Sequence, residues 1–260
     1  MWIITENIKI EYNSITGSVK LYSNGGTLRQ DWLEQTDIPR SDIRSISVAE
    51  GKVLLPENAS SYFEYCNNIK KLDLRGFDTH GVKYMSYMFH HCNELESLDL
   101  STFDTSCVTN MYGMFAYCRS LKSLNLGRFD TSKVTNMSFM FYNCASLAKM
   151  DLTGFDTSNV TAMNGMFESC ENMTSIDLNN FSTGNVTTMM NMFAECRKLK
   201  KLDLKNFDTS KVTNMVNMFK GCKSLQQIIL EPICDPHIDT NTMFFGCRKD
   251  LILTDGTTEP

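Results

Sequence analysis

One block of 26 residues recurs almost unchanged along most of this sequence. The segment LDLSTFDTSCVTNMYGMFAYCRS starts at Leu98, and LNLGRFDTSKVTNMSFMFYNCAS starts at Leu124. Further copies start at Met150, Ile176 and Leu202, with a looser copy from Leu72. Repeats of roughly 20–50 residues are typical of solenoids and propellers, in which each unit buries its apolar face only by stacking on its neighbours. The repeat therefore predicts one elongated domain whose function lies on a repeated surface.

Within each copy, the spacing of the apolar residues changes from two to three or four. The leucines of the LDL segment flank Asp99, which predicts a short strand with both leucines inward and Asp99 outward. The FDTS segment from Phe103 has turn chemistry, and Thr109 and Asn110 are good helix N-cap residues. The next apolar residues have the spacing of one helical face: Val108, Met111, Met114, Phe115, Cys118 and Leu121. We expect a strand, a turn, a helix of about two turns and a return loop in every coil.

The ends of the sequence depart from the repeat. Residues 1–45 are predicted to form an N-terminal cap rich in β-structure, with strands in residues 2–12 and 18–22 and a short helix over residues 31–37. Residues 46–254 are predicted to form a solenoid of about eight 26-residue coils, including degenerate coils at both ends. Residues 255–260 are assigned to a tail.

Composition excludes several classes of protein. Hydrophobic residues make up 42% of the chain and charged residues 21%, as in globular proteins. The net charge of −5, with Lys and Arg spread along the chain, disfavours a nucleic-acid partner, which requires a basic stripe. No apolar run is long enough for a membrane span, and residues 1–6 lack the basic and apolar regions of a signal peptide.

The cysteines recur with the repeat. One falls in each copy, and the last arrives one residue early: Cys66, Cys92, Cys118, Cys144, Cys170, Cys196, Cys222 and Cys247. Stacking places them at equivalent positions, which favours small buried apolar residues over a zinc site or disulfides. Cys107 lies off this column and is predicted to be exposed, and Cys234 in the terminal segment is predicted to have no special role.

The shared pattern LDLxxFDTSxVTNMxxMFxxCxSL extends from about residue 69 to residue 230. It closely resembles the BspA-like leucine-rich repeat, a 26-residue repeat of bacterial surface proteins that also occurs in mycoplasma lipoproteins. The resemblance implies a leucine-rich-repeat solenoid with a parallel sheet on one face. Together with the helices expected from the spacing, the predicted fold is an α/β repeat with short helices on the other face. The resemblance also implies a secreted or surface-exposed protein used for adhesion or host contact, and it supplies no catalytic residues.

The outward position of each strand is almost always acidic. The column consists of Asp73, Asp99, Asn125, Asp151, Asp177 and Asp203, and nearby outward cations are Lys71, Arg75, Lys149, Lys201 and Lys205. One interpretation is a solvated ladder held by these cations and by neighbouring hydroxyls. A second is a polar face that binds a basic or hydroxyl-rich partner. A row of calcium sites is the least favoured, because one carboxylate per coil supplies too few ligands.

Two further columns carry candidate residues. The FDTS turns contribute Asp78, Asp104, Asp130, Asp156 and Asp208, which we interpret as structural because acidic side chains bond to backbone groups in turns. On the helical side, Tyr87, Phe139 and Tyr142 occupy positions where other copies have polar or small residues. Exposed aromatic residues often anchor interfaces, so this side is a second candidate for partner binding.

Nothing in the sequence indicates catalysis or a cofactor. His80, His90 and His91 lie at positions that other copies fill freely, which predicts surface residues rather than a general base, and no nucleophile, phosphate-loop or zinc motif is present. The sequence predicts a non-enzymatic protein-interaction module, with a bacterial adhesin or host-interaction protein as the first hypothesis. The alternatives are an intracellular scaffold, carbohydrate or calcium binding on the Asp-lined face, and an enzyme with its site in residues 1–45.

Overall fold

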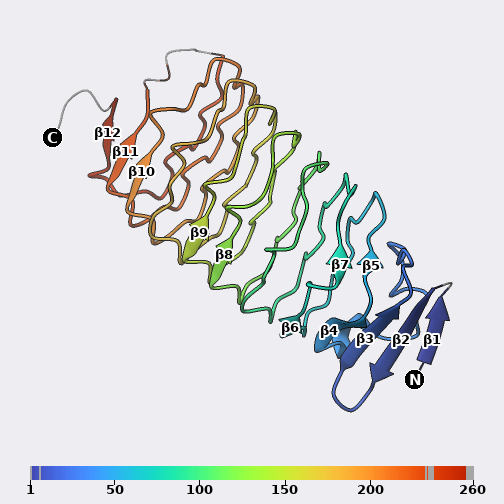
Figure 1. The fold of residues 1–260 in the computed structure, drawn as a ribbon. Coiled ribbons are helices and arrows are strands. Elements are labelled where there is room, and N and C mark those ends of the chain that lie inside the picture. The colour runs from blue at the N-terminus through green and yellow to red at the C-terminus, as the bar shows by residue number, and fades with distance from the viewer. Residues whose placement is uncertain (1, 6, 232, 234–236, 256–260) are drawn as a thin grey trace.

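The structure is a computed structural model that describes residues 2–5, 7–231, 233 and 237–255. Figure 1 shows an elongated stack of coils that begins at a twisted N-terminal sheet and ends beside three parallel strands. The stack is a parallel β-solenoid of about nine turns, against about eight expected. Its strands are β1 (Trp2–Thr5), β2 (Ile8–Asn13), β3 (Ser18–Ser23), β4 (Ser45–Glu50), β5 (Val53–Leu54), β6 (Lys71–Leu72), β7 (Phe77–Asp78), β8 (Ser123–Asn125), β9 (Lys149–Asp151), β10 (Lys201–Asp203), β11 (Gln227–Ile229) and β12 (Ile252–Thr254).

The first sheet connects the N-terminal segment to the coils. Its strand order is β1-β2-β3-β4-β6; β1, β2 and β3 pair antiparallel, and β3, β4 and β6 pair parallel. The helix predicted over residues 31–37 is wrong, because this segment forms turns and is followed by a short 3₁₀ helix, η1 (Arg40–Asp42). Thr36 closes one of these turns, with both its N–H and its hydroxyl donating to the carbonyl of Leu33.

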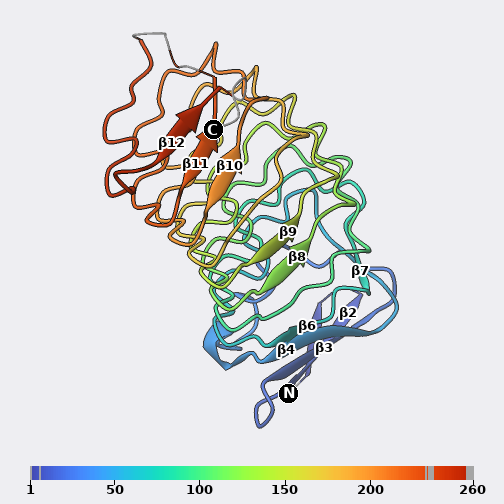
Figure 2. The same cartoon turned by 90° about the vertical axis from the view of Figure 1, so that its left-hand side faces the viewer.

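The strand face carries the predicted parallel sheet, but the sheet is interrupted. Strands β8 and β9 form one pair and β10, β11 and β12 form a triplet, as Figure 2 shows, whereas residues 98–100 and 176–178 are not strands. A second ladder is continuous and lies in the VTN segments. Its single-residue bridges join Asn58, Tyr84, Asn110, Asn136, Ala162, Thr188, Asn214 and Asp239 in turn.

The helices predicted on the other face are wrong, since the described residues contain almost no helix. The neighbouring coil accepts the backbone N–H groups that would otherwise form the hydrogen bonds within a helix. The N–H groups of Gly113, Phe115 and Tyr117 donate to carbonyls of the next coil at 3.0, 2.9 and 2.7 Å. Between these bonds the chain makes tight turns, such as Cys118 N–H to the carbonyl of Phe115 at 3.0 Å. Asn110 caps such a turn rather than a helix, because its Oδ1 accepts the N–H of Tyr112.

Two left-handed residues, four positions apart, allow this alternation. Gly113 and Tyr117 have φ of 59° and 62°, and the other coils repeat the pair at equivalent positions. The result is a four-residue period that directs residues at spacings of three and four toward the interior. That spacing is also the spacing of a helical face, so the sequence pattern alone could not distinguish the two structures. We call this side of the solenoid the turn face.

The core is a set of parallel columns of identical residues. One phenylalanine per coil stacks on the next at centroid distances of 5.5–5.9 Å, with ring planes 2–12° apart. The stack runs through Phe63, Phe89, Phe115, Phe141, Phe167, Phe193, Phe219 and Phe244. Methionines fill the space beside it, and most residues of these columns are fully buried.

The cysteine column lies in this core as free thiols, as the sequence predicts. From Cys92 onward, each sulfur of the column also donates a hydrogen bond to a phenylalanine carbonyl of the preceding coil, for example Cys118 Sγ to the carbonyl of Phe89 at 3.1 Å. Burial raises the pKa of the Cys118 and Cys170 thiols to about 12. Cys107 is half-buried rather than fully exposed, and Cys234 lies outside the described residues.

Alkylation should therefore separate Cys107 from the column. With iodoacetamide at pH 8, we expect Cys107 to be labelled in the folded protein, and Cys118 and Cys170 only after unfolding in guanidinium. The reason is that the thiolate is the reactive form and that burial both suppresses it and blocks access. Peptide mass spectrometry of native and unfolded samples gives the labelled fractions. Equal native labelling of Cys118 and Cys107 would contradict a buried column.

The coils stack with a single polarity on the turn face. Each coil directs its N–H groups toward the following coil, so the first coil presents carbonyls that no earlier coil covers. The N-terminal segment covers them with side-chain donors: Gln30 Nε2 donates to the carbonyl of Ser60 at 2.7 Å, and Arg40 Nη1 to that of Glu64 at 2.6 Å. These contacts satisfy backbone acceptors at the start of the stack.

Candidate functional site

The acidic column of the strand face makes local turns. In each coil the Oδ1 atom accepts the N–H of the residue two positions ahead, at 3.0–3.2 Å. This geometry applies to Asp73, Asp99, Asn125, Asp151, Asp177 and Asp203. An amide oxygen serves as well as a carboxylate, which explains why Asn125 fits the column. One oxygen of each side chain is therefore held by the backbone.

Cations and hydroxyls reduce the charge repulsion along this column. Arg75 binds Asp73 through two side-chain bonds of 2.9 and 2.6 Å, and it holds the pKa of that carboxyl below its usual range. The hydroxyls of Ser101 and Thr153 lower the pKa values of Asp99 and Asp151 in the same way. Lys205 Nζ lies 3.4 Å from Asp203. Three of the predicted cations are exposed and make no ion pair within the described residues: Lys71, Lys149 and Lys201.

The structure brings four of the predicted residues together in a shallow depression of about 260 Å³. Lys71, Asp73, Arg75 and Asp99 line it, together with Lys70, Leu72, Leu74 and Ser97. It lies where β6 has no strand partner in the next coil, because residues 98–100 do not pair with it. The remaining predicted residues of the strand face are distributed along the solenoid.

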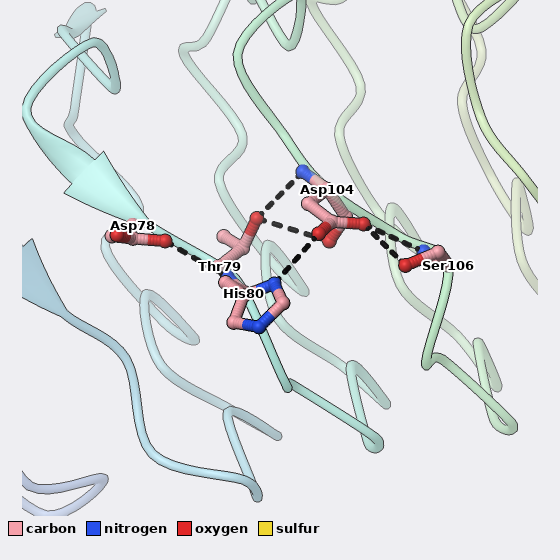
Figure 3. Close-up of polar contacts among 5 residues, drawn as sticks. All are labelled: Asp78, Thr79, His80, Asp104 and Ser106. Atoms are coloured by element: carbon pink, nitrogen blue, oxygen red, sulfur yellow. Dashed lines mark hydrogen bonds and ion pairs between the residues drawn. The ribbon is translucent and has the colours of Figure 1, made fainter.

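The FDTS turns join neighbouring coils through a buried threonine. Thr79 Oγ1 donates to the carbonyl of Asp104 at 3.0 Å and accepts its N–H at 2.8 Å, and the same exchange recurs in the following coils. The carboxylate of Asp104 meanwhile accepts from Ser106 Oγ at 2.7 Å and from the backbone N–H of Ser106 (Figure 3). The structural role predicted for this second acidic column is consistent with these bonds.

Figure 3 also shows His80 beside Asp104, with Nδ1 3.1 Å from Oδ2. Serine, aspartate and histidine thus meet, but the aspartate lies between the other two. A nucleophilic triad needs the imidazole between the hydroxyl and the carboxylate so that it can accept the hydroxyl proton. The His80 side chain is 82% exposed, as predicted for a surface residue.

Acid should weaken the fold through Asp104. The Ser106 hydroxyl, the Ser106 N–H and His80 together lower the pKa of Asp104 to about 2. A depressed folded-state pKa stabilises the protein above the unfolded value of about 3.9, and this stabilisation is lost as pH falls toward 2. Asp104→Asn should therefore be less stable than the natural protein at pH 5, and the gap should close by pH 2.

Urea midpoints at pH 5, 4, 3 and 2 measure this gap. Because the Ser106 hydroxyl is the largest cause of the shift, Ser106→Ala should remove more of the pH dependence than His80→Gln. A gap between Asp104→Asn and the natural protein that stays constant from pH 5 to pH 2 would refute the assignment.

Aromatic side chains form a contiguous group on the turn face of the first coils, which we call the aromatic surface. Its rings contact one another at centroid distances of 4.2–5.8 Å. It consists of Tyr65, Tyr87, His90, His91, Tyr112, Tyr117, Phe139 and Tyr142. The three residues predicted for this side, Tyr87, Phe139 and Tyr142, all belong to it and are half-buried.

The histidines of this group are less accessible than the sequence predicts. The His90 side chain is only 13% exposed, because its Nδ1 lies 2.7 Å from Glu64 and Tyr87 packs against the ring. His91 stacks between Tyr65 and Tyr117 at 5.0 and 4.2 Å. Burial, followed by the neighbouring charges of His90 and Arg119, lowers the pKa of His91, so its imidazole is neutral at neutral pH.

The predicted binding residues did not include five members of this surface, nor the arginine beside it, Arg119. The five members are Tyr65, His90, His91, Tyr112 and Tyr117. The available signal was a column of small or flexible residues four positions after that of Tyr87. Other copies carry Asn143, Ser169, Glu195 and Gly221 at the position of Tyr117. Asparagine and glycine favour the left-handed region that this column adopts, so aromatic residues there are exceptions.

No group of three or more histidine, cysteine, aspartate or glutamate side chains within the described residues is arranged to hold a metal ion. Over the same residues, no helix has the length and apolar character needed to cross a membrane.

Comparison with known proteins identifies the repeat. A family model described as "Mycoplasma protein of unknown function, DUF285" matches residues 57–176 and, in a second overlapping alignment, residues 146–251. The chain belongs to the DUF285 family. The two alignments share residues 146–176, as expected when one model can align in more than one register of a periodic chain. The DUF285 match confirms the resemblance to mycoplasma-type leucine-rich repeats.

Several solved structures are similar to this DUF285 chain. A leucine-rich repeat protein from Bacteroides ovatus has 19% identity and a TM-score of 0.44, with 87% of this chain and 64% of that chain covered. A leucine-rich repeat protein from T. pallidum has 19% identity and a TM-score of 0.42, covering 76% and 90%. A leucine rich cell surface protein from Faecalibacterium prausnitzii has 14% identity and a TM-score of 0.31, covering 88% of both chains.

The chain thus spans less than two thirds of the length of the Bacteroides ovatus protein. No curated protein matches the sequence.

Proposed function

We propose that this chain is a non-enzymatic protein-interaction module that binds a protein partner through the solvent-facing columns of its solenoid. The observation that carries the proposal is the contrast between a constant interior and a variable surface within one chain. Inward positions repeat the same valine, methionine, phenylalanine and cysteine in successive coils. The turn-face position of Tyr87, which is half-buried, instead becomes Gly113, Phe139, Gly165 and Asn191 in the next coils. A constant frame with varied surface residues suits the extended binding surfaces that solenoids present.

Two surfaces are candidates. The first is the strand-face depression lined by Lys71, Asp73, Arg75 and Asp99, with the rest of the acidic and basic columns predicted for that face. The second is the aromatic surface, which has the tyrosine and arginine composition of interface hot spots. The aromatic surface fits a protein partner better, because the carboxylates of the strand face are already engaged in turns and ion pairs.

We further propose that the module acts outside the cell or at its surface, as an adhesin or host-interaction protein. The support is the resemblance of the repeat to bacterial surface repeats and to repeats of mycoplasma lipoproteins. The competing proposal is an intracellular scaffold, which the free cysteines of the described residues would suit.

Parallel binding assays test both proposals. Immobilised protein is exposed to host extracellular-matrix proteins and, separately, to cytosolic lysate, and saturable binding to one defined matrix protein is expected. Substitutions that the repeat itself uses keep the fold: Tyr87→Ser, as at Ser61, and Phe139→Asn, as at Asn191, should weaken binding. The control, Lys149→Ser, changes an exposed strand-face position elsewhere on the solenoid. Failure to bind any matrix protein, with selective binding of a cytosolic protein, would favour the scaffold.

A further inference from the structure

The aromatic surface offers partners an unusual chemistry, because its rings present edges rather than faces. Tyr65, His91 and Tyr117 stack with ring planes 17° and 8° apart, so the facing sides of these rings cover one another and both faces of His91 are covered. The stacked rings leave no gap between them into which a proline ring of a partner could insert. Aromatic edges carry the positive end of the ring quadrupole, so they attract electron-rich groups.

Hydrogen-bond donors follow these edges. Tyrosine hydroxyls come in neighbouring pairs, because the Tyr117 ring contacts that of Tyr142 and the Tyr87 ring contacts that of Tyr112. A phenolic O–H can donate to an acceptor on a partner. Tyr65 at the start of the stack is 49% exposed.

Two carboxylates lie at the aromatic surface, and neither is within ion-pair distance of Arg119. Glu64 is 19% exposed and is bound to His90, and Glu168 lies beside Phe139 and Tyr142 at the far end of the surface. Arg119 is exposed, lies 5.3 Å from the Tyr117 ring centroid, and makes no ion pair with any described residue. Arg197, the equivalent arginine three coils later, is bound by Glu195 and lies near Glu171. The guanidinium of Arg119 is thus positioned without the carboxylates that its counterpart has.

The stacking of coils does not require these aromatic residues. Tyr65, His91 and Tyr117 have φ of 58–62°, and the same backbone is formed with asparagine, serine, glutamate or glycine in later coils. Bulky residues in this region are costly, and such strain often marks a binding site. Since stacking does not require them, their concentration in three successive coils beside an arginine without an ion pair among the described residues points to a role of the surface itself.

We propose that the aromatic surface binds an acidic segment of a partner protein, with a carboxylate of that segment on Arg119 and further acceptors on the tyrosine hydroxyls. The proposal rests on the protein-binding function proposed above and names the partner's chemistry. A sulfated polysaccharide offers similar anions, but the net charge of −5 repels a long polyanion, so a peptide with a few carboxylates fits better.

The test uses the full chain and a display library of random twelve-residue peptides. We expect selected peptides to be enriched in aspartate and glutamate relative to the unselected library. A fluorescein-labelled selected peptide should bind about tenfold more weakly to Arg119→Ala, which introduces the residue of the next coil, Ala145. Tyr117→Asn likewise introduces the residue of the next coil, Asn143, and should weaken binding similarly. Binding of the selected peptide to the unsubstituted protein should weaken as the salt concentration is raised.

Arg197→Ala is the matched control, since it removes an arginine from the same column in a later coil, and it should leave the affinity unchanged. A selection without acidic enrichment, or an affinity insensitive to Arg119→Ala, would overturn the proposal. A heparin octasaccharide that binds through Arg119 while no peptide is selected would overturn it in favour of a glycan. Acidic peptides that depend on Lys71 and Arg75 instead would refute this site and leave the protein-binding function standing.

Discussion

Replacing Phe141 by alanine is expected to lower the free energy of unfolding by about 3–5 kcal/mol. The ring is fully buried and lies between Phe115 and Phe167, at centroid distances of 5.7 and 5.6 Å. The loss includes the transfer energy of the ring, the cavity and two stacking contacts, which the fixed positions of the neighbouring coils cannot recover. Urea unfolding followed by circular dichroism measures the change.

The matched control is Phe245→Ala, because that ring is 65% exposed. This substitution should change the free energy of unfolding by less than about 0.5 kcal/mol. Tryptophan fluorescence reports separately on the N-terminal segment, which contains both tryptophans of the chain, Trp2 and Trp32. Coincident transitions would indicate that the Phe141 coil and this segment unfold together. A loss below about 1 kcal/mol for Phe141→Ala would show that the phenylalanine column is not the centre of the core.

Thr131→Val should be nearly as damaging although it keeps the shape of the side chain. The Thr131 hydroxyl is fully buried, donates to the carbonyl of Asp156 at 2.8 Å and accepts its N–H at 2.9 Å. Valine would leave both backbone groups of Asp156 unsatisfied, at a cost of about 2–4 kcal/mol. Chemical denaturation provides the measurement, and Thr131→Ser, which restores the hydroxyl, should recover most of the loss.

Thr135→Val is the internal control for this prediction. The Thr135 hydroxyl is exposed, and the Thr109 carbonyl that accepts it also accepts the Thr135 N–H. Its loss should change stability by less than about 0.5 kcal/mol. Equal effects of Thr131→Val and Thr135→Val would mean that the buried exchange between coils is not what stabilises the FDTS turn.

The core could be predicted from the sequence because, in a stack of coils, residues one repeat period apart contact one another. Residues 26 positions apart, such as Cys92 and Cys118 or Phe115 and Phe141, are neighbours in space. The period also indicated which residues face inward. It did not indicate where the strand ladder is interrupted, since residues 98–100 carry the same LDL pattern as the paired strands.

The helices were wrongly predicted because two structures share one pattern. Met111, Met114, Phe115 and Cys118 have the spacing of a helical face, but each coil gives its alternate N–H groups to the next coil. Only the neighbouring coil decides between the alternatives, and a pattern read within one copy does not contain that information. The left-handed residues that permit the turns were visible only as a scatter of Gly and Asn at two positions.

The candidate surface was partly accessible to sequence reasoning. Tyr87, Phe139 and Tyr142 stood out because equivalent positions hold smaller or polar residues. The packing that unites them was not visible: a β-carbon on Gly113 would lie 2.7 Å from the Tyr87 ring, and one on Gly165 would lie 2.5 Å from the Phe139 ring. These glycines leave room for the rings of the preceding coil, so the aromatic surface depends on small residues one coil away.

The single polarity of the turn-face hydrogen bonds constrains how such a protein can change its length. On the turn face, every junction between coils pairs N–H groups of one coil with carbonyls of the next. A gene rearrangement that duplicates or deletes whole multiples of the period keeps each junction matched, whereas an insertion of part of a repeat places non-equivalent residues opposite one another. Recombination between near-identical copies can therefore generate longer and shorter relatives at little cost in folding, while the varied outward residues are reshuffled into new combinations.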